Sequence, residues 1–410
     1  MKLILCTPTF VTGRGGIPSY ARDFVEIFKQ DYEIIVVTGG KKINDSPCKL
    51  YYIDSKDLNY NNVNKLFGII QEEKPDIIVN SAFFVLSILT PYIDNRIKII
   101  TISHFVDGIY PRFASINSQY IDKIVALSSF GKSYIEKKYS IKNENKVVSI
   151  YNFMPTLTET PNTHKEHNDV LNIVYPGGSN YQKSADIFLK AVLYLLKTNL
   201  KFKLYWIGGI GMPGSKWGIT IINSLSDILP KDERIVHLGS VSREEAKKIM
   251  ENANVFILPS RGEGFPISII EAMRGRCIPV ISDAKHGALD IIKNGVNGYV
   301  TKQGDYLDLA KCIENIITNH NSLSGIYNAS YNTYLQNLTA EVWAEKMKNI
   351  MLSNSNHTLR KIYSKNKIKI LISLLKNRLY LVKFRLKQIF INNIRTLFTY
   401  YIIAINKKKY

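Results

Sequence analysis

The sequence predicts an α/β protein with two doubly wound domains, each a parallel sheet with helices on both faces, followed by a basic helical tail. Three observations support this class. Short apolar segments of strand length alternate with longer segments that have a helical period. The alternation pauses at a polar, proline-containing stretch, 155–169, and then starts again. The last acidic residue is Glu345, whereas Lys and Arg occur up to Lys409.

The first domain, residues 1–158, has six apolar segments of strand length. They are 2–7, 33–38, 76–80, 98–103, 123–127 and 147–150. Helices fit between them, for example over 17–28 and 130–139. Because strands and helices alternate, we expect the strands to run parallel and to be covered on both faces.

The second domain, residues 170–330, repeats this pattern. Its expected strands are 172–175, 203–207, 235–238, 255–258 and 277–282, and its clearest helices are 185–197 and 243–252. In such domains ligands bind outside the carboxyl ends of the strands. The cleft between the two domains is therefore the expected site.

The charge is concentrated in the tail. The chain of 410 residues has a net charge of +20, from 54 Lys and Arg against 34 Asp and Glu. The first 345 residues hold 38 basic and 34 acidic residues, and the rest hold 16 basic residues and no acidic one. A nucleic-acid-binding protein would use such charge, but it lies beyond the domains and outside any recognisable recognition module. We therefore expect no nucleic acid as a partner.

The cysteines and the hydropathy indicate the cellular compartment in which the protein is expected. Cys6, Cys48, Cys277 and Cys312 are scattered, without a Cys-x-x-Cys pair or a nearby His at metal spacing. This fits a reducing compartment and argues against a zinc site or a disulfide framework. No clean apolar run of about 18 residues occurs, so no membrane-spanning helix is predicted. We expect a cytoplasmic or peripheral protein.

Two glutamates, Glu263 and Glu271, stand on either side of Gly264 and Pro266. Glycine and proline interrupt a helix here, because proline favours a first helical turn and glycine a loop. Glu263 is therefore expected in the loop after strand 255–258, and Glu271 within the next helix. The free NH groups at the start of that helix suit a phosphate, so the two carboxylates fit two parts of one long ligand.

The block around these glutamates resembles the GT-B glycosyltransferases of family 4. The resemblance includes the Glu-x7-Glu spacing with "EGFP" and "EAM" inside 237–273, and also "DIIKNGVNGYV" at 290–300 and "IYNF" at 150–153. "EVWAEKMKNI" at 341–350 resembles the family's helix that crosses back to the first domain, here 331–352. The resemblance covers residues 1 to about 350 and implies the GT-B fold, with two Rossmann-like domains facing a cleft.

The resemblance implies roles for the glutamates and for one histidine. Glu263 would lie beside the donor sugar and Glu271 would hold the ribose hydroxyls, which agrees with the strength of a carboxylate as a hydroxyl acceptor. Gly264 and Phe265, between them, would also contact the donor. His104, after strand 98–103, resembles the family's histidine near the attacked carbon. We therefore take His104 and Glu263 as the candidate catalytic residues.

Further donor contacts are expected from two loops. Gly15 and Gly16, in "VTGRGGIPSY", resemble the family's glycine pair and would let backbone NH groups approach a phosphate. A nicotinamide-dependent oxidoreductase would also explain this turn, but not the two glutamates, and the third glycine of G-x-G-x-x-G is missing. Lys183 matches the family's diphosphate lysine.

The sequence departs from the family at the residue that should share the diphosphate charge. Gly178 stands where the family has an arginine. The missing charge would then fall to another residue such as Arg14 or Arg261. The chain has no Asp-x-Asp pair, so neither a metal nor a cofactor is expected.

The tail predicts an amphipathic helix over 361–390. One stripe is apolar and comprises Ile368, Leu371, Leu375, Leu379, Val382, Leu386 and Ile389. Cations border it, namely Lys367, Arg378 and Arg385 on one side and Lys369, Lys376, Lys383 and Lys387 on the other. This pattern is typical of an interfacial helix on anionic lipid. The alternative is a helix that packs its stripe on the protein itself. Deletion of the tail, 356–410, is expected to spare both domains.

The family resemblance, taken with the tail and the missing Asp-x-Asp pair, implies a retaining, metal-independent glycosyltransferase of the hexosyltransferase type. It would move a sugar from a nucleotide-sugar, a UDP-sugar, to a saccharide or lipid-linked acceptor in bacterial surface polysaccharide or glycolipid synthesis. We expect it on the cytoplasmic face of the cell membrane, as a peripheral protein. A GT-B-fold epimerase or phosphorylase is the alternative within the same fold.

Overall fold

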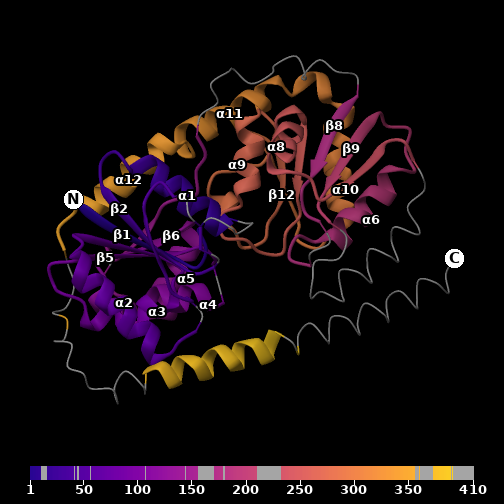
Figure 1. Cartoon of the computed structure of the whole chain (residues 1–410). Coiled ribbons are helices and arrows are strands. Elements are labelled where there is room, and N and C mark those ends of the chain that lie inside the picture. Colours follow the sequence, from indigo (N-terminus) through magenta and orange to yellow (C-terminus); the bar gives the residue numbers. More distant parts are fainter. Residues whose placement is uncertain are drawn as a thin grey trace. The chain divides into compact units, whose positions relative to one another are not determined.

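The computed structural model describes residues 1–10, 16–40, 42–43, 46–55, 57–106, 108–143, 145–155, 170–178, 181–209, 232–355, 360, 373–388 and 390. The chain divides into two compact units, each with its own parallel sheet (Figure 1). The first unit is Met1–Asn152 with Ala340–Leu386, and the second is Phe153–Thr339 with Lys387–Tyr410. Within the described ranges, no helix combines the length and the apolar character needed to cross a membrane.

The first unit contains seven parallel strands in the order β3-β2-β1-β4-β5-β6-β7. They are β1 (Lys2–Thr7), β2 (Glu33–Thr38), β3 (Lys49–Tyr52), β4 (Ile77–Ser81), β5 (Lys98–Ser103), β6 (Lys123–Ala126) and β7 (Val147–Ser149). The central strands are buried on both faces, which explains their nearly continuous apolar sequences. All strands run the same way, so their carboxyl ends share one edge of the sheet.

Helices cover both faces of this sheet. They are α1 (Gly16–Phe28), α2 (Tyr60–Glu73), α3 (Phe84–Leu89), α4 (Ile109–Ser115), α5 (Ser129–Lys138) and α12 (Ala340–Leu352). Side chains of α2 to α5 pack together against one face. On the other face α12 lies beside α1 (Figure 1). Trp343 of α12 packs there against Tyr20, Phe24 and Phe28 of α1, with ring centroids 5.5, 5.7 and 5.5 Å away. The helix α12 therefore completes the core of the first unit.

The second unit contains six parallel strands in the order β10-β9-β8-β11-β12-β13. They are β8 (Leu171–Tyr175), β9 (Phe202–Ile207), β10 (Ile235–Gly239), β11 (Val255–Leu258), β12 (Ile278–Ser282) and β13 (Tyr299–Thr301). Its described helices are α6 (Ala185–Leu195), α8 (Arg243–Asn252), α9 (Ile267–Arg274), α10 (Tyr306–Thr318) and α11 (Ser324–Asn337). Two doubly wound parallel sheets were predicted, and this fold class is confirmed.

The predicted elements agree with the observed ones to within two residues at most ends, but two strands were missed. β3 is a half-exposed edge strand, and β13 has only three residues. The segment 331–352, predicted as one crossing helix, contains the end of α11 in the second unit and α12 in the first. Most of the stretch 155–169 lies outside the described residues.

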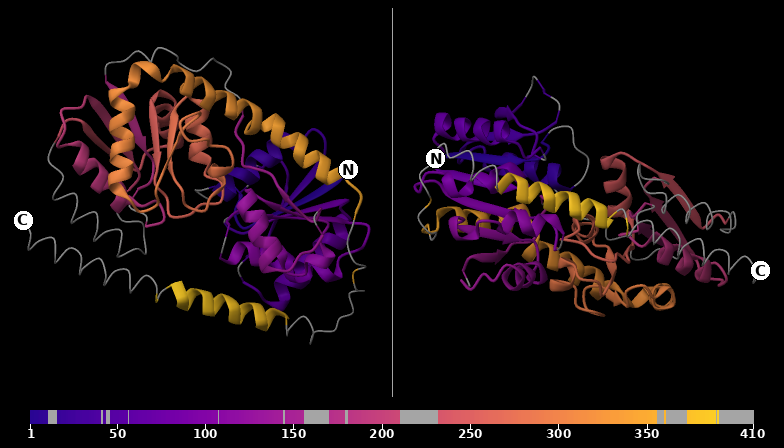
Figure 2. Two further views of the ribbon diagram at one scale, coloured as in Figure 1. Left: turned by 180° about the vertical axis from the view of Figure 1, so that it is seen from behind. Right: turned by 90° about the horizontal axis from the view of Figure 1, so that it is seen from below.

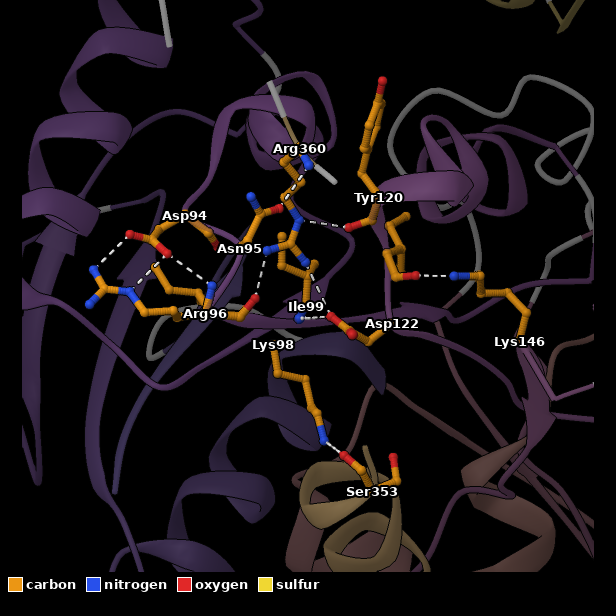
Figure 3. A network of polar contacts seen from close by, with 12 residues as sticks. Asp94, Asn95, Arg96, Lys98, Ile99, Tyr120, Asp122, Lys146, Ser353 and Arg360 are labelled. Carbon is orange, nitrogen blue, oxygen red and sulfur yellow. Dashed lines mark hydrogen bonds and ion pairs between the residues drawn. The ribbon is translucent and has the colours of Figure 1, made fainter. Parts of the chain in front are cut away.

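Arg360 anchors the segment after α12 to the first sheet (Figure 3). Its side chain is fully buried, and its guanidinium lies 3.2 Å from Oδ2 of Asp122, whose side chain is 1% exposed. The guanidinium also donates hydrogen bonds to the carbonyl oxygens of Asp94, Ile97 and Tyr120, at 2.7, 2.7 and 2.9 Å. A cation with this many buried partners belongs to the folded core. The structure therefore predicts that deletion after Ser355 destabilises the first unit, whereas the sequence predicted that it spares both domains.

Lysines at the amino ends of the strands extend this network. The ammonium of Lys98 at the start of β5 donates to the carbonyl oxygen of Ser353, just after α12 (Figure 3). It also donates to the carbonyl oxygen of Met351, in the last turn of α12. Lys146, before β7, donates to the carbonyl oxygen of Ile121. The amino edge of the first sheet thus holds the end of α12 in place, opposite the edge where ligands bind in such sheets.

A C-terminal helix, residues 373–388, packs against the first unit through one of its faces (Figure 2). Leu374 and Asn377 are buried there, with 3% and 2% of their surfaces exposed. Arg112 of α4 lies over the ring of Tyr380 at 4.0 Å and donates to Oδ1 of Asn377 at 3.3 Å. The helix is therefore docked on the protein.

The predicted apolar stripe lies on another face of this helix. At 3.6 residues per turn, its side chains point roughly away from Leu374 and Asn377. They are exposed by 60% at Leu375, 53% at Leu379, 51% at Val382 and 60% at Leu386. The three other stripe residues, Ile368, Leu371 and Ile389, lie outside the described residues. The four described members do not pack on the protein's own surface.

Candidate functional site

His104 lies at the carboxyl edge of the first sheet, directly after β5. Its side chain is 7% exposed, and its Nε2 is 2.8 Å from the hydroxyl oxygen of Ser81, the last residue of β4. The edge of its ring meets the ring of Tyr20 at 5.1 Å. Burial lowers the pKa of His104 to about 4. The imidazole is therefore neutral near pH 7 and held by groups from β4, β5 and α1.

Gly16 is the first residue of α1, after the loop that follows β1. It therefore stands where the free NH groups of a helix N-terminus begin. Gly15 and Arg14 lie outside the described residues. Of the predicted glycine pair, the structure thus describes only one member.

In the second unit Glu263 lies in the loop between β11 and α9, and 9% of it is exposed. Its Oε1 accepts a hydrogen bond from the hydroxyl of Ser260 at 3.0 Å. The same oxygen lies 2.6 Å from the ammonium of Lys183. Two groups predicted to bind different parts of one ligand are thus in direct contact.

Glu271 lies inside α9, which ends at Arg274 with Gly275 as its C-cap. It is 8% exposed, and Phe265, before the helix, is 3% exposed. The carbonyl oxygen of Gly264 accepts a hydrogen bond from the NH of Gly287 at 2.7 Å. This bond joins the loops that follow β11 and β12, so the residues around Glu263 are supported by the neighbouring strand end.

Lys183 is positioned by the loop between β8 and α6. The hydroxyl of Tyr175, a fully buried residue of β8, donates to the carbonyl oxygen of Lys183 at 2.9 Å. Gln182 donates from Nε2 to the carbonyl oxygen of Gly262 at 2.7 Å, and its own carbonyl accepts from the NH of Arg261 at 2.8 Å. These bonds join the loops after β8 and β11 at the carboxyl edge of the sheet.

Arg261, one of the two predicted substitutes for the missing diphosphate arginine, is already paired. It binds Asp186 through two hydrogen bonds of 2.9 and 2.7 Å, and its guanidinium lies 4.0 Å from the ring centroid of Tyr181. This bidentate pair holds the start of α6. In this arrangement Arg261 braces the loop around Lys183.

Gly178, at the position expected for the arginine, has a φ of +51°. Its neighbour Gly208, with a φ of +121°, packs so closely that an added Cβ on Gly208 would lie 2.5 Å from the Cα of Gly178. The two loops therefore touch through backbone atoms. Where the family resemblance predicts an arginine side chain, this chain has two backbone segments in close contact.

The sequence interpretation missed His286, which follows β12 and is 1% exposed. Its Nε2 lies 3.0 Å from the carbonyl oxygen of Ser282. It also missed Ser81 and Ser260, which contact His104 and Glu263. A signal was available, since each of these residues stands at or just after the carboxyl end of a strand, where ligands bind in such domains.

The match to a family model lies within the second unit. Residues 158–333 match the family described as Glycosyl transferases group 1. CapM of Staphylococcus aureus, a capsular polysaccharide biosynthesis glycosyltransferase, is 29% identical over 154 residues, 38% of this chain and 38% of CapM. CapH, of the same description and organism, is 22% identical over 298 residues, 67% of this chain and 80% of CapH.

A third relative has a name that specifies its acceptor. It is an N-acetylgalactosaminyltransferase of Campylobacter jejuni that acts on a GalNAc-diNAcBac saccharide carried by PP-undecaprenol. It is 26% identical over 209 residues, 50% of this chain and 53% of that enzyme. The chain thus spans about half of this relative and 38% of CapM.

Solved structures are similar to this chain over most of its length, including both units. HepE of Anabaena in complex with UDP has a TM-score of 0.69 at 15% identity, covering 85% of this chain and 99% of HepE. The lipopolysaccharide outer core galactosyltransferase WaaB has a TM-score of 0.66 at 20% identity, covering 86% of this chain and 99% of WaaB. At these identities the likeness shows the fold, which is GT-B.

Proposed function

We propose that the chain transfers a sugar from a UDP-sugar to a saccharide or lipid-linked acceptor, because residues 158–333 match the family of glycosyl transferases group 1 and the fold is GT-B. The observation that carries the proposal is the contact of Lys183 with Glu263 at the carboxyl edge of the second sheet. The pathway would be surface polysaccharide or glycolipid synthesis, which the names of CapM and CapH support.

The second unit would bind the donor. Glu271 accepts hydrogen bonds from the ribose hydroxyls, because a carboxylate binds a diol with two charge-assisted bonds. Glu263 receives hydroxyls of the sugar, while Gly264 and Phe265 border the same loop. Neighbours in complex with UDP, and with UDP and glucose, support a uridine nucleotide at this fold position.

Lys183 would bind the diphosphate. Its ammonium has Glu263 as its carboxylate partner, with 26% of its own side chain exposed. A diphosphate is a stronger competitor for an ammonium than one carboxylate, because it carries more negative charge. Donor binding would then move Lys183 from Glu263 to phosphate and leave Glu263 to the sugar. Gly15 and Gly16 would contribute backbone NH groups to donor binding, as their resemblance to the family's glycine pair implies.

The transfer would retain the anomeric configuration through attack on the face from which UDP leaves. The bond from the anomeric carbon to the phosphate oxygen breaks, the acceptor oxygen bonds to that carbon, and the leaving diphosphate takes the acceptor's proton. A neutral His104 suits this scheme as a hydrogen-bonding partner of the sugar, because burial keeps it uncharged. The chemistry uses charges from side chains and the donor, without a metal.

The C-terminal helix would hold the enzyme on an anionic membrane. Its stripe of Leu375, Leu379, Val382 and Leu386 is exposed, while its other face is docked on the first unit. Exposed cations flank the stripe, namely Lys376, Lys383, Arg385 and Lys387. Each contributes about 1 kcal/mol near an anionic lipid surface, so their sum exceeds thermal energy severalfold. The enzyme would be peripheral on the cytoplasmic face, with residues 361–390 as the contact.

The docked helix also reaches the loop that follows His104. The ring of Phe384 lies 3.6 Å from where a Cβ would stand on Gly108, four residues after His104. A membrane-bound helix would therefore hold this acceptor-side loop close to the lipid. A lipid-linked acceptor is supported by this position, and by the PP-undecaprenol in the name of the Campylobacter relative.

A panel of nucleotide sugars tests the proposal directly. The full chain is incubated with UDP-glucose, UDP-galactose, UDP-N-acetylglucosamine and GDP-mannose, and release of nucleoside diphosphate is followed with and without EDTA. We expect release from at least one UDP-sugar, unchanged by EDTA. Release from GDP-mannose alone contradicts the uridine assignment, and activity restored by Mg²⁺ contradicts the metal-independent mechanism.

A further inference from the structure

His286 has a buried imidazole with one nitrogen free to accept a hydrogen bond. Its Nε2 donates to the carbonyl oxygen of Ser282 at 3.0 Å, which assigns the ring hydrogen to Nε2 and leaves a lone pair on Nδ1. Among the residues that the structure describes, Nδ1 has no hydrogen-bond partner, although the side chain is 1% exposed. Such a group costs about 1 to 3 kcal/mol if it stays unpaired, so it calls for a hydrogen-bond donor that the described residues do not supply.

The imidazole is attached to the loop that carries Glu263. The residue after His286, Gly287, donates its NH to the carbonyl oxygen of Gly264 at 2.7 Å. Burial lowers the pKa of His286, against the opposing effect of the Glu263 carboxylate, so the ring is neutral near pH 7. The unpaired nitrogen therefore belongs to the same strand-end region as the candidate sugar-binding carboxylate.

Two serines link the positions of these side chains. The hydroxyl of Ser282, whose carbonyl holds His286, donates to the carbonyl oxygen of Ser260 at 2.5 Å. The hydroxyl of Ser260 donates in turn to Oε1 of Glu263 at 3.0 Å. All four residues are buried, with at most 9% of their surfaces exposed. The ring and the carboxylate are therefore held by one hydrogen-bonded set of residues from the ends of β11 and β12.

The chemistry of Nδ1 selects its ligand. A lone pair needs a donor of hydrogen, and ionised phosphate oxygens have none, whereas sugar hydroxyls do. A carboxylate and a neutral imidazole at the ends of two neighbouring strands offer several acceptors and suit a molecule with neighbouring hydroxyls. Resting on the proposed function, we propose that Nδ1 of His286 accepts a hydrogen bond from a hydroxyl of the donor sugar and so helps to select that sugar.

Two substitutions separate this role from structural support. His286→Gln retains an amide donor near Nε2 for the carbonyl of Ser282 but lacks the acceptor at Nδ1. His286→Asn places its amide oxygen near Nδ1 and loses the reach to Ser282. If the ring only supports the loop, His286→Gln is the milder change. If Nδ1 binds the sugar, His286→Asn retains more activity.

The experiment uses the UDP-sugar that gives the fastest UDP release and analogues of it that each lack one hydroxyl. For the wild type we expect one analogue to lower kcat/KM by about tenfold, because a buried acceptor is left unpaired. The His286→Gln substitution should lower kcat/KM for the complete UDP-sugar by about tenfold. In this variant the same analogue should lower kcat/KM by less than about twofold further, and the Kd of UDP should stay within about twofold of the wild-type value.

Other outcomes overturn the inference. Equal sensitivity of wild type and His286→Gln to every analogue removes the sugar contact, while the proposed transferase activity stands. A matching fall in UDP affinity and in thermal stability assigns His286 to loop support only. If the wild type releases UDP from no UDP-sugar, the proposed function fails, and this inference fails with it.

Discussion

The ammonium of Lys183 lies 2.6 Å from Oε1 of Glu263, so the candidate diphosphate and sugar residues neutralise each other without a ligand. The side chains are 26% and 10% exposed, which leaves the pair accessible to a charged ligand. A bound donor would give each residue a new partner, phosphate for the lysine and hydroxyls for the glutamate. After this exchange the lysine would still face an anion and the carboxylate would still accept hydrogen bonds, so neither group would be left without a partner.

Replacement of Glu271 by alanine should weaken UDP binding. The ribose would lose an acceptor that makes charge-assisted hydrogen bonds, at a cost of about 1.5 to 3 kcal/mol. Titration calorimetry with UDP measures this loss, and Glu244→Ala, an exposed acidic residue of α8, is the control. Unchanged UDP affinity in the Glu271 variant removes the ribose assignment.

The neutral state of His104 should appear in the pH dependence of stability. Its pKa falls from 6.5 to about 4 on folding, so between these values the unfolded chain binds a proton that the folded protein does not. The free energy of unfolding should therefore decrease as the pH falls through this window. Urea unfolding at pH 7.5 and pH 4.5 should show a loss about 2 to 3 kcal/mol larger for the wild type than for His104→Gln. Equal losses would mean that His104 is already protonated in the folded protein at pH 4.5, so that folding does not lower its pKa.

Arg360→Ala should strongly destabilise the first unit. The substitution removes the guanidinium that pairs with the buried carboxylate of Asp122. Removing one partner of a buried ion pair costs about 3 to 5 kcal/mol. The matched control is Arg378→Ala, whose pair with Asp57 is exposed and should matter little. Denaturant unfolding compares the variants. A truncation after Ser355 should show the Arg360 defect, and a stable truncated protein contradicts the anchoring role.

The exposed stripe should bind lipid without contributing to stability. Leu379→Glu with Val382→Glu should abolish flotation with phosphatidylserine vesicles, while the Tm stays unchanged because both side chains are about half exposed. Leu307→Glu, at an exposed leucine of α10, should bind like the wild type. Wild-type binding should weaken with salt, which screens charge over about 8 to 10 Å at physiological ionic strength. Vesicle binding by the double variant would place the membrane contact elsewhere.

The sequence predicted most strands because burial on both faces leaves a clear apolar segment, as in β1 and β5. It missed β3, because an edge strand with half-exposed side chains lacks that signal. Arg360 looked like one more tail cation, since composition alone does not reveal a partner as distant in the sequence as Asp122. The fold was thus readable from local patterns, whereas this contact depends on tertiary structure.

In the candidate site, too, some features were predicted from the local sequence and others depend on tertiary contacts. Glu263 and Glu271 were predicted in a loop and in the helix after it, and the structure places them there, because glycine and proline mark that boundary locally. The engagement of Arg261 with Asp186 was not predicted, because nothing near Arg261 in the sequence identifies its partner. His286 was overlooked because its environment comes from neighbouring strand ends that are joined only by folding.

The most direct test of the transferase assignment is a comparison of turnover and UDP affinity in Glu263→Gln. The glutamine retains an oxygen for Ser260 but loses the charge that is proposed to act on the transferred sugar. We predict that kcat for the preferred UDP-sugar falls on the order of a hundredfold, while the Kd of UDP changes less than about threefold. A parallel fall in UDP affinity and kcat would show that Glu263 holds the nucleotide, and an unchanged kcat would contradict its role in sugar transfer altogether.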